Sequence, residues 1–364
     1  MKIIGIDISQ IIYGTGVSNL TVELVDAILK IDKDNKYVLF GSSLRGFFKL
    51  REFCKKYPDA KHLIYPFPIS VFEFFFHRLN LPIELFCSSI DVFHCSDWLT
   101  PRSKRAKIVV PVYDLTTKII PSDHVIKTIV IHETRIRRAI KYSSFITFLS
   151  LSTRKDFFNF YKFDAKKTEI IYPSTNIAQV KQLSIAKIKA KFNINKPYIL
   201  SVSTLQPRKN LETLVNGYNQ IPNKDNNQLV IVGPQGWGTV NIVSTSNIIQ
   251  TGFVTSEELV TLYRNALVFV YPSYYEGFGL PIIEAMTFGI PTICAPVSSM
   301  PEAGGNAAEY FDQSSSKDLA KKIMQLINLS PGDRKSISSK SIKNAKRFSW
   351  TTSAKKMIKI YESI

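Results

Sequence analysis

Short apolar segments alternate with longer amphipathic ones along almost the whole of this chain. Runs of four to six apolar or β-branched residues between turn residues are typical of strands buried in parallel sheets. The first half contains such runs at 3–8, 37–40, 90–94, 108–112 and 145–149. A second series lies at 198–202, 229–232, 248–251, 267–271 and 292–295.

Segments between these strands carry apolar residues at helical spacing. After the first strand, one stripe of a predicted helix contains Leu20, Leu24, Ala27, Ile28 and Ile31. Strands that alternate with helices along a chain predict parallel sheets with helices on both faces. We therefore predict an α/β fold of the Rossmann-like type.

The two series of strands predict two domains, because 364 residues exceed one ordinary hydrophobic core. A polar, Lys-rich span separates the series and is interpreted as a linker. The last helix has one apolar stripe that runs from Trp350 to Ile364. The predicted division is a first domain at 1–175, a linker at 176–195, a second domain at 196–345 and a C-terminal helix at 346–364.

Composition describes a globular protein, with 45% hydrophobic residues, 16 Gly and 18 Pro and no low-complexity tract. Four cysteines lack metal-site spacing and are expected to be free thiols in a reducing compartment.

Asp7 stands where a signal peptide would carry its apolar core, so the N-terminus is interpreted as a first strand. Without an uncharged apolar stretch of membrane-spanning length, we expect a cytoplasmic protein.

The most informative segment, P-S-Y-Y-E-G-F-G-L-P-I-I-E-A-M at 272–286, follows the predicted strand 267–271. It places Glu276 and Glu284 eight positions apart around a loop that opens a helix, with Pro281 suited to the first helical position. Gly277 and Gly279 allow a sharp turn there. A helix N-terminus attracts phosphate through free N–H groups and the helix dipole. A simpler alternative makes Glu284 only a first-turn acid that complements this dipole.

This E-x7-E spacing around E-G-F-G-L-P resembles the signature of retaining GT-B glycosyltransferases of family four. Three further segments, in the right order, resemble motifs of the family: 198–214, which contains P-R-K-N, 251–266 and 299–308. The resemblance implies the GT-B fold, with two Rossmann-like domains whose parallel sheets face across a cleft. It also implies an acceptor-binding N-terminal domain, a donor-binding C-terminal domain and a last helix that packs back on the N-terminal domain.

The family motifs imply roles for individual residues. Arg208 can grip phosphate oxygens bidentately and Lys209 can neutralise charge, so both are expected at the donor diphosphate. Glu284 resembles the family's glutamate for the ribose hydroxyls, and Glu276 the one that contacts the transferred sugar and steadies its positive charge. The donor-binding set is completed by Gly14, Gly16, Gly252, Phe253, Val254, Gly277, Phe278, Gly279 and Leu280.

One position departs from the family pattern. Many members carry His-Asp at a strand end where this chain has Tyr113 and Asp114. A tyrosine hydroxyl forms hydrogen bonds but is a poor base at neutral pH. In this family the leaving phosphate is thought to take the acceptor's proton, so Tyr113 is expected to position the sugar, and both residues are kept as catalytic candidates.

Metal and nucleic acid are not expected as partners. The sequence has no D-x-D motif in a donor-binding context, no cluster of metal ligands and no nucleic-acid-binding motif.

A net charge of +18 is divided about evenly between the two halves of the chain. With the aromatic segment 71–81, it suggests an anionic membrane surface as a partner. The alternative is that Phe72, Phe75, Phe76 and Leu79 form a core stripe and the charges are solvated.

The predicted function is retaining, metal-independent transfer of a hexose from a nucleotide-diphosphate sugar to a glycan or lipid-linked glycan, as in cell-surface polysaccharide synthesis. No cofactor is expected beyond the donor, GDP-mannose or a UDP-hexose, with mannose favoured. The protein would be cytoplasmic or peripheral on the inner face of the membrane. Alternatives are a catalytically silent GT-B binding module or another nucleotide-sugar enzyme of this fold.

Overall fold

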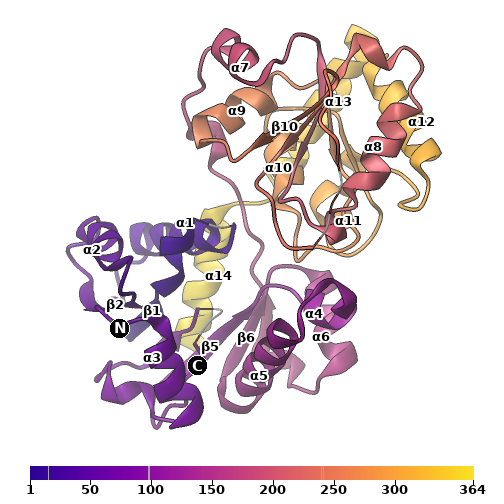
Figure 1. The fold of residues 1–364 in the computed structure, drawn as a ribbon. Helices are drawn as coiled ribbons and strands as arrows, with labels where there is room; N and C mark the ends of the chain where they lie inside the picture. Colours follow the sequence, from indigo (N-terminus) through magenta and orange to yellow (C-terminus); the bar gives the residue numbers. More distant parts are fainter. Residues whose placement is uncertain (15, 97–98, 239, 241) are drawn as a thin grey trace. The chain divides into compact units, whose positions relative to one another are not determined.

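The computed structural model describes residues 1–364 except residues 15, 97, 98, 239 and 241. The chain forms two compact units (Figure 1). The first comprises Met1–Pro173 with Ser349–Ile364, and the second comprises Ser174–Phe348. Each unit has its own parallel sheet, as the alternating pattern of the sequence predicts.

The first unit contains a seven-stranded sheet in the order β3-β2-β1-β4-β5-β6-β7. Neighbouring strands pair in parallel throughout. The strand order reverses direction between β1 and β4, and ligands of open α/β sheets bind beyond the carboxyl ends of strands at such a point. The strands are β1 (Ile3–Asp7), β2 (Lys36–Ser42), β3 (Lys61–Tyr65), β4 (Val92–His94), β5 (Lys107–Val112), β6 (Phe145–Phe148) and β7 (Thr168–Ile170).

Helices cover this sheet, and the buried side chains form two hydrophobic clusters. One cluster includes Phe40, Phe93 and Phe148, and the other includes Ile4, Leu39 and residues of the C-terminal helix. The main helices are α1 (Gly16–Ile31), α2 (Phe47–Lys55), α3 (Ile69–Glu73), α4 (Thr116–Ile119), α5 (Ile126–Tyr142), α6 (Leu151–Phe160) and α14 (Trp350–Ser363), with a 3-10 turn η1 (Ser9–Tyr13) after β1.

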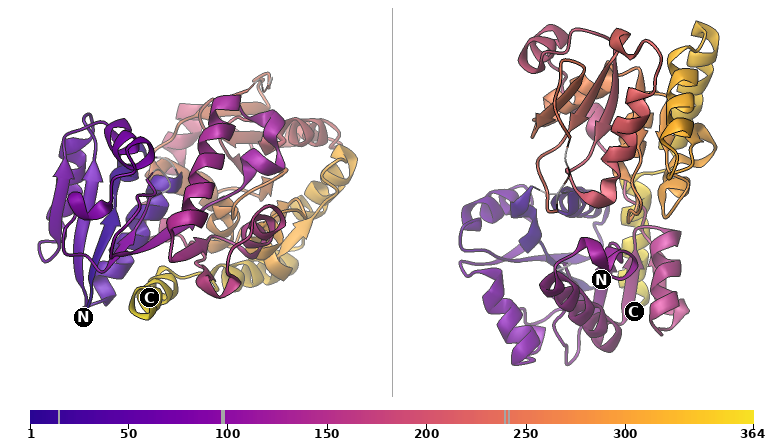
Figure 2. Two further views of the ribbon diagram at one scale, coloured as in Figure 1. Left: turned by 90° about the horizontal axis from the view of Figure 1, so that it is seen from below. Right: turned by 45° about the vertical axis from the view of Figure 1, so that its right-hand side comes forward.

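The C-terminal helix α14 belongs to the first unit although the second unit precedes it in sequence. Its apolar stripe, with Ala354, Met357 and Tyr361, is buried in the same cluster as Val25 and Ile28 of α1. Figures 1 and 2 show this helix in yellow beside the indigo α1. Burial of the stripe therefore accounts for the position of the last helix.

The second unit contains a six-stranded parallel sheet in the order β10-β9-β8-β11-β12-β13, with a reversal between β8 and β11. Its strands are β8 (Tyr198–Val202), β9 (Gln228–Val232), β10 (Ile248–Gly252), β11 (Val268–Tyr271), β12 (Thr292–Cys294) and β13 (Ala308–Tyr310). Its helices are α7 (Ile185–Phe192), α8 (Leu211–Asn219), α9 (Ser256–Arg264), α10 (Leu280–Thr287), α11 (Met300–Gly304), α12 (Ser316–Ile327) and α13 (Pro331–Ala345), with a 3-10 turn η7 (Pro207–Lys209) after β8.

Residues 176–195 differ from the predicted linker. They include the helix α7, which packs against α9 and buries Ile188. The Lys-rich composition of this span reflects the exposed face of an amphipathic helix rather than an unstructured connection. The span belongs to the second unit, which begins at Ser174.

The aromatic segment 71–81 is mostly core rather than a membrane-binding surface. Phe72 and Phe76 are buried, and Phe75 packs against their cluster. A π-helical turn at Phe74–Arg78 changes the helical phase, so Phe74 and Leu79 are exposed. The core interpretation is therefore confirmed for Phe72 and Phe76 but is wrong for Leu79.

All four cysteines lie within the described part of the chain and are buried free thiols, as predicted. Among the described residues, no helix combines the length and apolar character that a membrane span requires.

Candidate donor and acceptor sites

The reversal of strand order in the second unit brings two distant segments together. β8 and β11 are neighbours in the sheet, so the turn after β8 and the loop after β11 emerge at the same edge. The first carries Arg208 and Lys209 on η7, and the second carries Glu276. A backbone hydrogen bond of 2.8 Å from Tyr274 N to Arg208 O joins the two segments.

Lys209, Arg208 and Glu276 form a buried charge cluster. The Lys209 Nζ lies 2.5 Å from Glu276 Oε1, and Arg208 Nη1 lies 3.0 Å from the same oxygen. Lys209 is 6% exposed and Glu276 is 8% exposed, so these charges are largely removed from water. Lys209 Nζ also donates a hydrogen bond of 3.0 Å to the hydroxyl of Tyr271, the last residue of β11.

Glu276 is held as a carboxylate by this cluster. Burial would raise the pKa of Glu276, but the charges of Arg208 and Lys209 and the hydrogen bond from Lys209 bring it down to about 2. The backbone of Glu276 is fixed as well, because its carbonyl accepts hydrogen bonds from Ser298 Oγ at 2.5 Å and Ser299 Oγ at 2.9 Å. The carboxylate is therefore both charged at neutral pH and rigidly placed.

The helix α10 begins at Leu280, one residue before Pro281, the predicted first position. Gly279 precedes it with a φ of 94°, a left-handed conformation that disfavours residues with a Cβ, and Pro281 lies in its first turn. Gly277 does not have a positive φ, so of the two predicted turn glycines only Gly279 adopts the left-handed conformation. The Phe278 ring is buried edge-on against Phe348 at a centroid distance of 5.1 Å, so this side chain belongs to the core.

Glu284 lies on α10, partly exposed, and accepts a hydrogen bond of 2.9 Å from the Tyr263 hydroxyl of α9. Burial raises the pKa of Glu284, while the Tyr263 hydrogen bond acts in the opposite direction. This bond occupies Oε2 and orients the carboxyl group, whose other oxygen can accept a ligand hydroxyl.

The turn after β10 lies beside the end of β9. Gly233 N donates a hydrogen bond of 3.1 Å to Gly252 O, which ties the two strand ends together. Phe253 follows Gly252 and is 75% exposed, whereas Val254 is partly buried. These residues follow β10, which β9 and β8 separate from β11 in the sheet.

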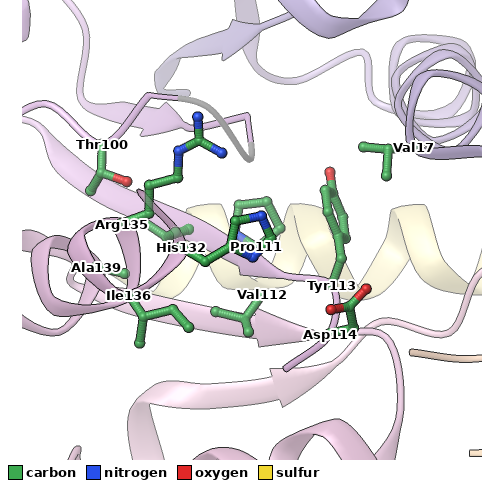
Figure 3. Close-up of a pocket in the computed structure, with 11 residues that line it drawn as sticks. Val17, Thr100, Pro111, Val112, Tyr113, Asp114, His132, Arg135, Ile136 and Ala139 are labelled. Atoms are coloured by element: carbon green, nitrogen blue, oxygen red, sulfur yellow. The ribbon is translucent and has the colours of Figure 1, made fainter. Parts of the chain in front are cut away.

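Two of the predicted residues of the first unit, Tyr113 and Asp114, line a cavity of about 200 Å³. Figure 3 shows Tyr113 and Asp114 at the end of β5, facing His132 and Arg135 from α5. Asp114 Oδ1 accepts hydrogen bonds from Thr116 N at 3.0 Å and Thr116 Oγ1 at 2.7 Å, so it also shapes the start of α4. The lining comprises Val17, Thr100, Val110, Pro111, Val112, Tyr113, Asp114, His132, Arg135, Ile136 and Ala139.

The glycine turn after β1 immediately precedes Val17 in the sequence, and Val17 is one of the residues that line the cavity. Gly14 has a φ of 65°, and a Cβ at Gly14 or Gly16 would meet no heavy atom of the residues that the structure describes within 4 Å. The middle residue of the Gly14 to Gly16 loop lies outside the described residues. Open space at both glycines leaves room for a ligand to approach the backbone.

Several residues in these sites carry no sequence signal of their own. Tyr271, Ser298 and Ser299 hold Lys209 or Glu276, and Tyr263 holds Glu284. Tyr263 and Ser299 lie in segments that resemble family motifs, but spacing alone does not reveal their partners. In the part of the chain that the structure describes, no group of three or more His, Cys, Asp or Glu side chains is arranged to hold a metal ion.

Part of this chain is similar in sequence to known sugar transferases. Residues 184–347 match the family described as "Glycosyl transferases group 1". The O-antigen chain mannosyltransferase B of Escherichia coli is 34% identical over 174 residues, which cover 45% of each chain. The O-antigen chain mannosyltransferase RfbU of Salmonella typhimurium is 26% identical over 200 residues, which cover 52% of this chain and 54% of the relative. The chain thus matches about half the length of these curated relatives.

Solved structures resemble the whole chain. Anabaena HepE in complex with UDP and glucose has a TM-score of 0.73 at 16% identity and covers 100% of both chains. WaaG, a glycosyltransferase involved in lipopolysaccharide biosynthesis, has a TM-score of 0.61 at 13% identity and covers 98% of this chain and 99% of its own.

Proposed function

We propose that the protein is a retaining hexosyltransferase with a nucleotide-sugar donor, because residues 184–347 of its second unit match the group 1 glycosyl transferases. The structural likeness over both units confirms the predicted GT-B fold. Activity, substrates and partners of the whole protein are inferred as follows.

The observation that carries the proposal is the charge cluster of Arg208, Lys209 and Glu276 at the reversal of strand order. A departing nucleoside diphosphate develops negative charge that fixed cations and N–H groups can stabilise. Arg208 has the more accessible cation, with 18% of its side chain exposed against 7% for Lys209. We assign Arg208 to the diphosphate, Lys209 to charge balance and to the placement of Glu276, and Glu276 to the sugar.

The proposed reaction proceeds on one face of the sugar. An oxygen of the acceptor hydroxyl bonds to the anomeric carbon while the bond from that carbon to the diphosphate oxygen breaks. The leaving phosphate oxygen takes the proton of the acceptor hydroxyl. Glu276 steadies the positive charge on the sugar ring, and Tyr113 positions the sugar as a neutral hydrogen-bonding group.

Mannose from GDP-mannose is the favoured donor, because the first relatives named above are O-antigen mannosyltransferases. A UDP-hexose is the alternative, since the similar structure of HepE contains UDP and glucose. Glu284, held by Tyr263, is assigned to the ribose hydroxyls, and the turn at Gly252, Phe253 and Val254 to the base. A growing cell-surface glycan or lipid-linked glycan is the proposed acceptor.

Thermal stabilisation of the purified protein by GDP, UDP, GDP-mannose and UDP-hexoses tests the donor site. We expect one base to raise the Tm, because a ligand that binds only the folded state stabilises it by mass action. Arg208→Ala should abolish that shift. Failure of every nucleotide to shift the wild-type Tm would favour a catalytically silent binding module.

An anionic membrane surface is proposed as a further partner on the acceptor side. Val125 and Ile126, at the start of α5, are 70% and 79% exposed and are followed by Lys127. Val130, one turn further along, is also exposed. Apolar side chains beside cations are typical of surfaces that rest on anionic lipids.

Sedimentation with anionic lipid vesicles at low salt tests this surface. We expect the wild type to sediment, and Ile126→Glu with Val130→Glu to remain in the supernatant. Phe48→Glu, which replaces another exposed apolar residue of the first unit, is the matched control and should sediment like the wild type. If the wild type stays in the supernatant, the membrane proposal is wrong.

A further inference from the structure

The loop that follows β12 contains a serine with an unusual backbone conformation. Ser298 has a φ of 56°, in the region that glycine adopts readily and that residues with a Cβ adopt only rarely. Asparagine tolerates this region because its side chain forms hydrogen bonds with the nearby backbone, and serine does so more weakly. In the described part of the second unit, the other non-glycine residues with a positive φ are all asparagines: Asn193, Asn210 and Asn223. Ser298 is therefore the exception among them.

A tight turn at 297–300 imposes this conformation. Met300 N donates a hydrogen bond of 3.3 Å to Val297 O, which closes the turn. The second central residue, Ser299, has a φ of −83° and a ψ of −6°. A positive φ followed by these values is typical of a type II′ turn, whose first central position is usually glycine. A serine at that position strains the backbone.

The Ser298 hydroxyl holds the backbone of Glu276 at two points. Ser298 Oγ accepts a hydrogen bond of 3.2 Å from Glu276 N and donates one of 2.5 Å to Glu276 O. Ser299 Oγ donates to the same carbonyl at 2.9 Å. One hydroxyl thus satisfies both the N–H and the C=O of the residue whose carboxylate balances Lys209 and Arg208. The two loops can meet because β12 pairs with β11.

We propose that Ser298 is a positioning residue for Glu276, and that the turn tolerates a strained serine because its hydroxyl fixes this backbone. Hydrogen bonds at both the N–H and the C=O restrict rotation about the backbone of Glu276, so its carboxylate stays beside Lys209 and Arg208. A displacement of about 1 Å in an active site can lower the rate by about 10²-fold. The importance of Ser298 for turnover rests on the function proposed above, whereas its hold on Glu276 is a property of the folded protein.

Three substitutions separate the hydroxyl from the strain. Ser298→Gly removes both, Ser298→Ala removes only the hydroxyl, and Ser298→Thr keeps both. We expect Ser298→Gly to have the highest Tm of the three, because glycine adopts a positive φ without strain. We expect kcat to fall by about tenfold to 10²-fold in Ser298→Gly and Ser298→Ala, and to fall much less in Ser298→Thr. A wild-type kcat in Ser298→Gly would overturn the proposal.

Asn223 is the matched control for strain. It has a φ of 53° and lies in an exposed part of the second unit, outside the charge cluster. Asn223→Gly should have a higher Tm than Asn223→Ala, and neither substitution should change kcat. A fall in kcat in Asn223→Ala as large as that in Ser298→Ala would contradict a specific role of the Ser298 hydroxyl.

Hydrogen exchange of the Glu276 amide tests the positioning independently of activity. In full-length protein labelled with ¹⁵N-glutamate, this amide is assigned as the signal missing in Glu276→Gln. It should exchange faster in Ser298→Gly and Ser298→Ala than in the wild type, because these variants lack its acceptor. Ser299→Ala should keep the wild-type exchange rate, because the Ser299 hydroxyl bonds the carbonyl and not the amide.

The two possible failures are distinguishable. An unchanged exchange rate of the Glu276 amide in Ser298→Gly would overturn the positioning role of Ser298. Failed turnover of every nucleotide sugar by the wild type would contradict the proposed function, but it would leave the exchange result as it stands.

Discussion

Arg208→Ala and Glu276→Ala each lower turnover by about 10²-fold or more, whereas Tyr113→Phe lowers it by less than about tenfold. In the proposed reaction, Arg208 and Glu276 act on charge that develops in the transition state, and both side chains are largely shielded from water. Tyr113 supplies one neutral hydrogen bond, which contributes much less. The measurement is kcat with the nucleotide sugar that stabilises the wild-type protein.

Arg264→Ala is the matched control for this comparison. Arg264 also lies in the second unit, but its guanidinium stacks over the Phe288 ring at 4.8 Å and is not part of the charge cluster. The kcat of the Arg264→Ala variant should remain close to that of the wild type. Similar rates for Arg208→Ala, Glu276→Ala and Tyr113→Phe would show that the assigned roles are wrong.

Glu276→Gln lowers the free energy of unfolding by about 3 kcal/mol at neutral pH, because the buried Lys209 loses the carboxylate that balances it. The pKa of Glu276 is about 2 in the folded protein against an ordinary value of 4.5. This stabilisation is therefore complete above pH 4.5 and is lost as the pH falls toward 2. Calorimetry from pH 7 to pH 3 should show the wild type approaching the variant only below about pH 4.5.

Glu309→Gln is the control for this stability prediction. Glu309 also lies in the second unit and pairs with Lys322 at 2.8 Å, but its side chain is 47% exposed. Such surface pairs contribute less than about 1 kcal/mol. An equal loss of stability in both variants would indicate that the buried cluster has no special role.

Secondary structure was predictable where strands are buried on both faces. The central strands β8, β9 and β11 are almost continuous apolar runs, and the sequence locates each within a residue or so. It misses β3, β7 and β13, which lie at the edges of the two sheets. Edge strands such as K-H-L-I-Y at Lys61–Tyr65 are partly exposed, so they lack a distinctive apolar run.

The sequence motifs of the candidate site were predictable, but the contacts between these motifs in the folded protein were not. The loop at Glu276 and the Arg-Lys turn are visible in the sequence, yet they lie 67 positions apart. Their contact depends on β8 and β11 being adjacent, which no local pattern specifies. The partner of Glu284 was equally hidden, because Tyr263 reaches it from another helix.

The sequence by itself determined two α/β units, their central strands and the start of α10 near a glycine and a proline. These features follow from local backbone preferences and from the period of apolar residues. Only the tertiary structure decided that α7 packs within the second unit, that Phe278 is core, and that Gln10 reaches Tyr113. Such contacts depend on packing between distant segments, where side-chain geometry rather than spacing along the chain selects the partner.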